Sequence, residues 1–323
     1  MPAKDDRPFL NRVPFLGYIF NRREVLKASS DTTPVGARDL AEIIAGSGKA
    51  NIRNLAIKHL SSRTDQDSIN AVCNFWVGTR SPELLSVIRE NSWHPDKPGA
   101  ARVELALVEN QPERLRQADP EEVGILIETL EDEDNETSSA ARTALENLEV
   151  QAGIDALCQE WKQSQNQAIQ DIIISAGHVA SRPDNLHFLT ATLTTSHSVI
   201  AEYGGKAVDK LNKSRSAKND QIATGARTLL LGLTSTETKD RLCELVVESE
   251  STDLEDIALE AGFAPSGEQE RALFFFLTAQ WEKYDEFDPD HSLLQEACED
   301  PAQGLYEGRR LRSALPGVAC EAS

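Results

Sequence analysis

The chain has 323 residues, of which 40% are hydrophobic and 27% charged, and its 33 basic and 53 acidic residues give a formal net charge of −20. This hydrophobic fraction is sufficient for a core, so the composition excludes wholesale disorder. Proteins that bind duplex nucleic acid normally present clustered lysine and arginine to the phosphates, so the negative charge argues against general nucleic-acid binding.

Residues 1–32 differ from the rest of the chain in charge and in aromatic content. Between Lys4 and Lys27, six basic residues accompany three acidic ones, and aromatic side chains are interspersed among them. Three interpretations remain open: a cap that folds back on the first helices, a docking arm for a partner protein, and a segment that binds an anionic membrane surface. The membrane interpretation ranks last, because anionic headgroups would repel the acidic body. If the segment is a docking arm, its expected contact residues are Phe15, Tyr18, Phe20, Arg22 and Arg23.

From Thr33 onward, the expected helix starts share one two-residue pattern. A residue whose side chain can accept hydrogen bonds from the first turn is followed directly by proline. The five pairs are Thr33-Pro34, Ser81-Pro82, Asp119-Pro120, Asp288-Pro289 and Asp300-Pro301. Proline costs little at the first helical position, because the backbone donor there has no partner within the helix. This repetition predicts that one architectural unit is used several times.

Apolar residues recur at helical spacing along residues 33–297, and no segment shows a convincing strand pattern. The threonine-rich stretch 190–195 has β-propensity, but it lies within a helical Leu-Phe-Leu pattern, and we predict a helix there too. In the middle of the chain, residues 121–148, 152–179 and 185–211 each fit a helix, a turn and a helix. Their starts are about thirty residues apart, a spacing typical of stacked helical pairs.

The second helices of several pairs share the motif A-[ILV]-x-x-L. It occurs as Ala56-Ile57 with Leu60, as Ala144-Leu145 with Leu148, and as Ala207-Val208 with Leu211. A small residue lets the neighbouring helix approach, and the aliphatic residues fill the remaining space. Because no single pair buries its faces alone, such units occur in arrays. The sequence therefore predicts an all-α solenoid of roughly seven or eight antiparallel helical pairs.

The last helices are expected within residues 265–297. Ser266 and Gln269 have the spacing of a capping box, and the six apolar residues 272–277 predict a helix buried between neighbours. The Asp288-Pro289 pair predicts the start of a following helix. The apolar face between these points continues at Trp281, Tyr284 and Phe287.

These repeats resemble a known family. The motifs R-x-x-A-I-x-x-L at 53–60 and A-A-R-T-A-L-x-x-L at 140–148 are similar to HEAT-type α-solenoid repeats, and the short period resembles the HEAT-like repeats of phycobilisome lyases and related bacterial proteins. The stretch 271–297 resembles the end of HEAT-like modules that precede WD-repeat propellers in some cyanobacterial proteins, although no propeller follows here. The expected organisation is a basic, aromatic cap or docking arm over 1–32, a HEAT-like solenoid over 33–298, and a C-terminal capping helix and tail over 299–323.

The sequence predicts neither a metal site nor a cofactor. The five cysteines include no C-x-x-C pair, which argues against structural zinc and a secreted disulfide framework, and we interpret most of them as core residues. His178, His187 and His197 lack the i,i+4 spacing of a helical metal pair. Gly204-Gly205-Lys206 lacks the context of a phosphate-binding loop. No catalytic residue stands out, and enzymatic activity is the less favoured alternative.

No apolar run approaches the roughly 20 residues that span a bilayer, and no cleavable signal is evident, so we expect a soluble cytoplasmic protein. Trp93 lies in a polar turn and is expected to be partly exposed, which adds it to the candidate partner contacts. The acidic run 131–136 is interpreted as a solvated turn, or as a feature that attracts a basic partner.

The predicted function is that of a non-catalytic scaffold or adaptor. Its concave, acidic solenoid surface would bind a partner protein with a basic patch, as a component of a larger complex. Two alternatives stay open. The resemblance to phycobilisome lyases implies an accessory subunit of a bilin lyase-like enzyme, and some HEAT-like proteins bind nucleic acid through a local basic groove.

Overall fold

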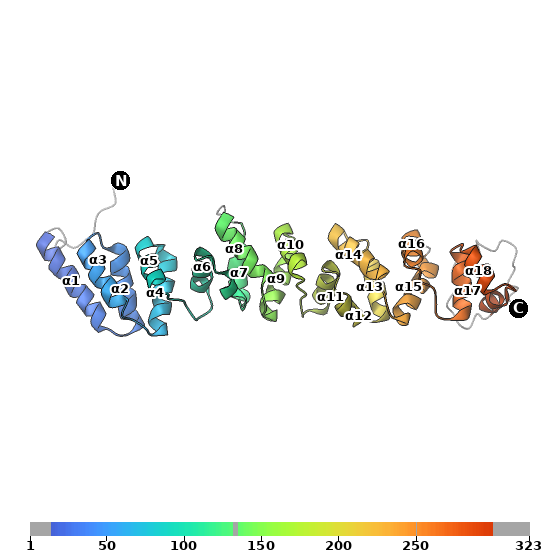
Figure 1. Ribbon diagram of the computed structural model, residues 1–323, viewed down its shortest axis with the longest axis horizontal. Helices are drawn as coiled ribbons and strands as arrows, with labels where there is room; N and C mark the ends of the chain where they lie inside the picture. Colours follow the sequence, from blue (N-terminus) through green and yellow to red (C-terminus); the bar gives the residue numbers. More distant parts are fainter. Residues whose placement is uncertain (1–13, 132–134, 250, 300–323) are drawn as a thin grey trace. The chain divides into compact units, whose positions relative to one another are not determined.

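The computed structural model describes residues 14–131, 135–249 and 251–299, and across these ranges the chain forms α-helices and no strand (Figure 1). The all-α prediction is confirmed for this part of the chain. Contacts between residues divide the protein into a first unit, residues 1–176, and a second unit, residues 177–323. The boundary between the units falls inside the segment 33–298, which was predicted as one solenoid.

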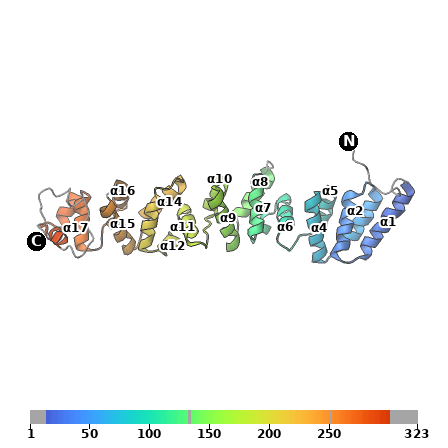
Figure 2. The same cartoon turned by 180° about the vertical axis from the view of Figure 1, so that it is seen from behind.

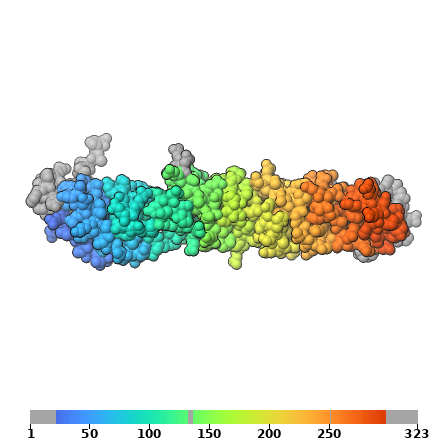
Figure 3. All heavy atoms as spheres, in the orientation of Figure 1, coloured from blue at the N-terminus to red at the C-terminus, as the bar shows by residue number. Residues whose placement is uncertain are grey.

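The helices of the first unit are α1 (Pro14–Ser30), α2 (Pro34–Gly46), α3 (Ala50–Leu60), α4 (Gln66–Thr79), α5 (Pro82–Glu90), α6 (Ala100–Val108), α7 (Pro120–Thr129), α8 (Asn135–Glu146), α9 (Gln151–Ser164) and α10 (Gln167–Ala176), with the 3-10 helix η2 (Pro112–Leu115) between α6 and α7. Helix α2 packs against α1, α3 and α4, and both ribbon views place it between α1 and α4 (Figure 1, Figure 2). Helix α6 packs against α4, η2, α7 and α8. Side chains fill the spaces between these ribbons (Figure 3).

The helices of the second unit are α11 (Asp184–Leu193), α12 (His197–Ala201), α13 (Gly205–Ser214), α14 (Asp220–Leu231), α15 (Thr236–Ser249), α16 (Thr252–Glu260), α17 (Glu268–Leu277), α18 (Trp281–Phe287) and α19 (Ser292–Glu299). Helix α11 packs mainly against α14 and α12, α13 packs against α14 and α15, and α17 packs against α18 and α19. The threonine-rich stretch lies largely in α11, where the buried hydroxyls of Thr190 and Thr192 donate to the carbonyls of Leu186 and Phe188. The helix predicted there is therefore confirmed.

The core of each unit consists of the residues that the helical periodicity selects. In the first unit Leu40, Ile44, Ile52 and Leu60 are fully or almost fully buried, and in the second Phe274 is fully buried. Cys73, Cys158 and Cys243 are buried too, as predicted, while the side chains of Cys298 and Cys320 lie outside the described residues. Burial raises the pKa of Cys73 and of Cys243 to about 12 each, which keeps both thiols protonated.

Polar contacts link residues about one repeat apart in sequence. The contacts Asn91–Ser61, Lys97–Asp67, Arg116–Glu149, Arg227–Glu260 and Arg241–Asp209 join residues separated by 30 to 33 positions. This spacing matches the sequence period of about thirty residues. Each contact joins two residues of the same unit.

Three of the five predicted cap-and-proline starts occur as helix starts. Ser81 accepts a hydrogen bond from the backbone N–H of Leu84, and Asp119 forms a full capping box with Glu122 at the start of α7. Thr33 is the N-cap of α2 and precedes a proline, but its side chain accepts no capping bond. The Asp300-Pro301 pair lies outside the described residues.

The prediction for Asp288-Pro289 is wrong. Helix α18 ends at Phe287, and α19 begins only at Ser292. The Asp288 carboxylate is almost fully buried and accepts hydrogen bonds from the backbone N–H groups of Leu293 and Leu294, at 3.1 and 2.9 Å. Asp288 therefore accepts hydrogen bonds from free backbone donors of α19 although it lies several residues before that helix. Pro289 also lies before the helix, so it does not occupy the first helical position.

Two further expectations for residues 265–297 are wrong. Helix α17 begins after Gly267 without a side-chain cap, because the Ser266 hydroxyl donates to Asp240 of α15, at 2.5 Å, and Gln269 donates to Glu296. Trp281 is 52% exposed rather than part of the core, and its ring meets Phe276 edge-on at 5.4 Å. Residues 272–275 are buried, as expected for the centre of the predicted apolar helix.

Candidate functional site

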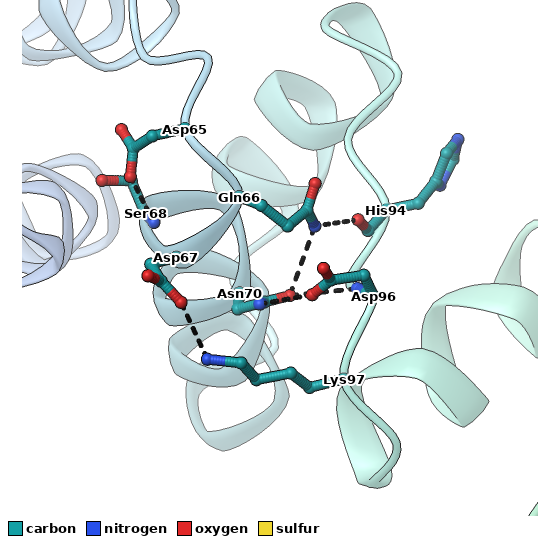
Figure 4. A network of polar contacts seen from close by, with 8 residues as sticks. All are labelled: Asp65, Gln66, Asp67, Ser68, Asn70, His94, Asp96 and Lys97. Atoms are coloured by element: carbon teal, nitrogen blue, oxygen red, sulfur yellow. Dashed lines mark hydrogen bonds and ion pairs between the residues drawn. The ribbon is translucent and has the colours of Figure 1, made fainter.

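Residues 91–99 connect α5 to α6 without a helix or strand, and buried side chains hold this connection in place. Asn70 of α4 is 4% exposed; its amide nitrogen donates to the Asp96 carboxylate at 2.7 Å, and its amide oxygen accepts from the Asp96 backbone N–H at 3.1 Å (Figure 4). Gln66 donates to the carbonyl of His94 at 2.8 Å. These bonds fix the connection onto α4 at two neighbouring points.

The end of the connection is held by a buried carboxylate. Glu122 of α7 is fully buried and accepts from the Gly99 backbone N–H at 3.0 Å and from Arg102 Nε at 2.6 Å. The same carboxylate accepts from the Asp119 backbone N–H and so completes the capping box of α7. One side chain therefore fixes the connection, α6 and α7 relative to one another.

Trp93 lies in this connection, and the expectation that it is partly exposed is wrong. Its side chain is only 6% exposed and belongs to the core of the first unit. The polar residues around it belong to a connection that is bonded onto α4, and this arrangement turns the indole inward. Trp93 is consequently not available as a surface contact for a partner.

The fixed connection places His94 beside Arg114 and Glu109. Arg114 Nη1 contacts His94 Nδ1 and lies 3.3 Å from Glu109 Oε2. Burial lowers the pKa of His94 below its usual value, and the positive charge of Arg114 lowers it further, against an opposing effect of Glu109. A neutral imidazole whose Nδ1 accepts from Arg114 is consistent with this geometry.

A hollow of about 480 Å³ opens at this cluster, and we call it the cationic hollow. It is lined by Arg89, Ser92, His94, Val108, Glu109, Gln111 and Arg114. Its two guanidinium groups outnumber its one carboxylate, although the chain as a whole is strongly acidic. Arg89 is held in place by donating to the Val108 carbonyl at 3.2 Å. The Gln111 Oε1 atom is buried and has no hydrogen-bond partner among the described residues.

A second hollow of about 430 Å³ lies next to the first, and we call it the acidic hollow. It is lined by Arg80, Glu104, Leu107, Val108, Ile125, Glu128, Thr129 and Thr137. Arg80 pairs with Glu104 and stacks over the Trp76 ring at 5.2 Å, so its charge is offset within the protein. Glu128 is exposed and forms no ion pair with a described residue, which leaves one carboxylate beside an apolar floor.

Val108 lines both hollows and is 38% exposed. It is the last residue of α6, so both hollows adjoin the end of that helix. The chain therefore places an exposed apolar residue between one acidic and one cationic depression. Protein-binding surfaces commonly combine an apolar centre with charged groups at the rim.

The other predicted contact residues lie in α1, far from this site in sequence. Arg22 and Arg23 are exposed, while the side chains of Phe15, Tyr18 and Phe20 lie outside the described residues. Helix α1 packs against α2 and α3 through buried Val25 and Ala28. This packing accords with the cap interpretation for residues 14–30 and leaves the two arginines accessible to a partner.

The remaining sequence candidates have internal roles. The ring of His187 contacts the carbonyl of Ala180, and Glu237 accepts from the backbone N–H of Gly205 at 2.8 Å, so a carboxylate of the protein itself occupies the start of α13. In the described part of the chain, no three His, Cys, Asp or Glu side chains form a group that could hold a metal ion. No helix within the same ranges has the length and apolar character needed to cross a membrane. Of the acidic run 131–136, residues 132–134 lie outside the description.

Sequence reasoning did not find the residues of the two hollows, because they come from six separate elements. Arg80 follows α4, Arg89 and Ser92 surround the end of α5, Val108 ends α6, Arg114 lies in η2, Glu128 lies in α7, and Thr137 lies in α8. The one available signal is local: Val108 and Glu109 join an apolar helix to a polar turn. Comparison with protein-family models, with curated proteins and with solved structures found no match for this chain.

Proposed function

We propose that this protein is a non-catalytic scaffold or adaptor that binds a partner protein carrying a basic patch. The observation that carries this proposal is how the arginines are used. Arg53, Arg116, Arg142, Arg227 and Arg241 each pair with a carboxylate of the protein itself. Four of these arginines pair with one carboxylate each, and Arg241 pairs with Asp209, Glu244 and Glu248. These pairs use only a few of the 53 acidic residues, so most of the acidic excess remains for the exterior.

Carboxylates without a partner stay at the surface, because burying an unpaired charge is very costly. Exposed acidic residues occur on several helices of both units, among them Asp39, Glu42, Glu121, Glu128 and Asp220. A surface of this kind attracts a basic partner over roughly one Debye length, about 8 Å at physiological ionic strength. Such attraction raises the rate of association and suppresses acidic competitors more than it sets the final affinity.

The helical packing supports a repeat scaffold for this role. Within each unit, polar contacts recur between residues 30 to 33 positions apart, as expected when helical pairs stack in HEAT-like fashion. Stacked pairs present an extended surface to which each repeat contributes similar positions. That architecture suits a binding scaffold because neighbouring repeats can contact successive parts of one partner.

The proposal is tested by affinity capture with the full chain, followed by binding measurements on the purified partner. The comparison is between the wild type and a variant with Asp39→Asn, Glu42→Gln, Glu121→Gln and Asp220→Asn, which removes exposed charge without altering the core. We expect a basic partner whose association rate falls with added salt and falls again in the neutralised variant. The absence of any protein partner, or a partner whose association rate is the same in both proteins, would contradict the proposal.

A further inference from the structure

We infer that the two hollows beside Val108 form one docking site for an extended segment of a partner protein. In this assignment, a basic side chain of the segment enters the acidic hollow and an acidic side chain enters the cationic hollow. The inference rests on the proposed function, because it assumes a protein partner, and it adds the chemistry of the segment that the partner presents.

The acidic hollow fits a long basic side chain. Leu107, Val108 and Ile125 supply apolar surface for the methylene stem, and the Glu128 carboxylate lies at the rim for the charged head. Lysine and arginine commonly bury their stems along apolar surface in this way while their charge stays near water. Glu104 is already paired with Arg80, so Glu128 is the carboxylate that remains for an incoming cation.

The cationic hollow fits an acidic side chain. Arg89 and Arg114 both line it, and Glu109 offsets only one of the two positive charges. Guanidinium groups bind carboxylates with paired, directional hydrogen bonds. Both arginines are held by contacts within the protein, Arg89 at the Val108 carbonyl and Arg114 between His94 and Glu109, so little side-chain freedom is lost on binding.

The site is held in shape before any partner binds. Asn70 and Glu122 fix the two halves of the 91–99 connection, which carries His94 and Ser92 in the wall of the cationic hollow. Val108 separates the two hollows and provides an apolar contact at their junction. A preorganised site of this kind favours one arrangement of charges on the incoming segment.

The test uses the full chain and four acetylated, amidated pentapeptides, with the sequences GRAEG, GEARG, GRARG and GEAEG. Side-chain Nε–H resonances of Arg80 and Arg114 report on the two hollows, and the Nε–H of Arg241, which lines neither hollow, is the reference. We expect one of the two mixed-charge peptides to shift both reporters in a saturable way while the reference stays unchanged. Equal shifts from the like-charged peptides, or no saturable shift from any peptide, would overturn the inference.

Charge exchange in the protein then tests the assignment of each hollow. Glu128→Lys and Arg89→Glu should each weaken binding of the preferred peptide by about tenfold, because each places like charges together. The double variant Glu128→Lys with Arg89→Glu should prefer the mixed peptide of opposite order. Glu282→Lys on α18 and Lys58→Glu on α3 are the matched controls: they make the same charge changes at exposed positions outside the hollows and should leave binding unchanged. If the double variant prefers the same mixed-charge peptide as the wild type, the charges at positions 128 and 89 do not determine which peptide binds.

The same single variants separate this inference from the proposed function. If a partner is captured and its association responds to salt, but Glu128→Lys and Arg89→Glu bind it like the wild type, the scaffold proposal stands and the docking site is wrong. If no partner is captured and none of the peptides binds, both fail. A partner whose affinity falls in these two variants and not in the two controls supports both.

Discussion

Asn70 and Asp96 form a reciprocal pair in which the Asn70 amide nitrogen donates to the Asp96 carboxylate at 2.7 Å and its oxygen accepts from the Asp96 backbone N–H at 3.1 Å. These two residues join α4 to the 91–99 connection across 26 positions of sequence. The Asn70 side chain is buried, so water has little access to compete for these two hydrogen bonds.

Replacing Asn70 should loosen the 91–99 connection. Asn70→Ala leaves the Asp96 backbone N–H without its buried partner, and we expect the free energy of unfolding to fall by about 1–3 kcal/mol. Amide hydrogen exchange should become faster in residues 91–99. Lys97→Ala is the matched control in the same connection, because the Lys97–Asp67 pair is exposed and surface pairs contribute less than about 1 kcal/mol. Equal losses in the two variants would contradict the role given to Asn70.

Glu122 should contribute far more to stability than an exposed acid in a comparable pair. Glu122→Gln leaves Arg102, whose side chain is 20% exposed, without its counter-charge, and we expect unfolding in urea to become easier by about 3–5 kcal/mol. Glu149→Gln removes the partner of Arg116 from an exposed pair and should cost less than about 1 kcal/mol. A small effect of Glu122→Gln would show that the buried pair does not hold α6 and α7 together.

His94 should make the protein less stable at mildly acidic pH. Burial and the charge of Arg114 lower the pKa of His94 in the folded state, so the unfolded chain, whose histidine has the ordinary value of 6.5, binds the proton more tightly. The unfolded state is therefore favoured increasingly as pH falls through 6.5 and below, and this loss is absent at higher pH. Denaturation of the wild type and of His94→Gln should give curves that converge at higher pH and separate on acidification, with the wild type losing more. Parallel curves would contradict this role of His94.

Two glycines of the first unit should respond to alanine in opposite directions. A Cβ on Gly124 of α7 meets no atom within 4 Å, so Gly124→Ala should stabilise the protein by about 0.5–1 kcal/mol through reduced freedom of the unfolded chain. A Cβ on Gly153 of α9 would lie 2.6 Å from the Ala118 carbonyl oxygen, so Gly153→Ala should be destabilising. Thermal unfolding of the two variants checks the sign of both effects. A stabilising Gly153→Ala would mean that α9 does not approach the Ala118 carbonyl.

Phe274 and Trp281 should differ sharply although both belong to the aromatic stretch near the end of the described chain. Phe274 is fully buried, so Phe274→Ala should cost about 3–5 kcal/mol. Trp281 is 52% exposed, and Trp281→Ala should cost less than about 1 kcal/mol. Urea unfolding monitored by far-UV circular dichroism measures both. A larger loss at Trp281 would place its ring in the core.

Local sequence patterns were enough to predict the helices and most of their core faces. These properties follow from local chemistry: apolar residues such as Leu40 and Ile44 recur at helical spacing, and Ser81 and Asp119 begin helices because their side chains accept hydrogen bonds from the first turn. Asp288 and Trp281 were wrongly placed because the same local patterns permit more than one outcome. The Asp288 carboxylate reaches donors five and six residues away, and the Trp281 ring lies at the edge of Phe276 outside the core.

No local pattern predicted where the surface carries the two hollows. Trp93 turned inward because Asn70 and Glu122, from two other helices, fix the connection that contains it. The two hollows beside Val108 combine side chains from α4 to α8, and no local pattern specifies which charges meet there. A helix depends on neighbours three and four residues away, whereas a surface depression depends on the packing of whole helices.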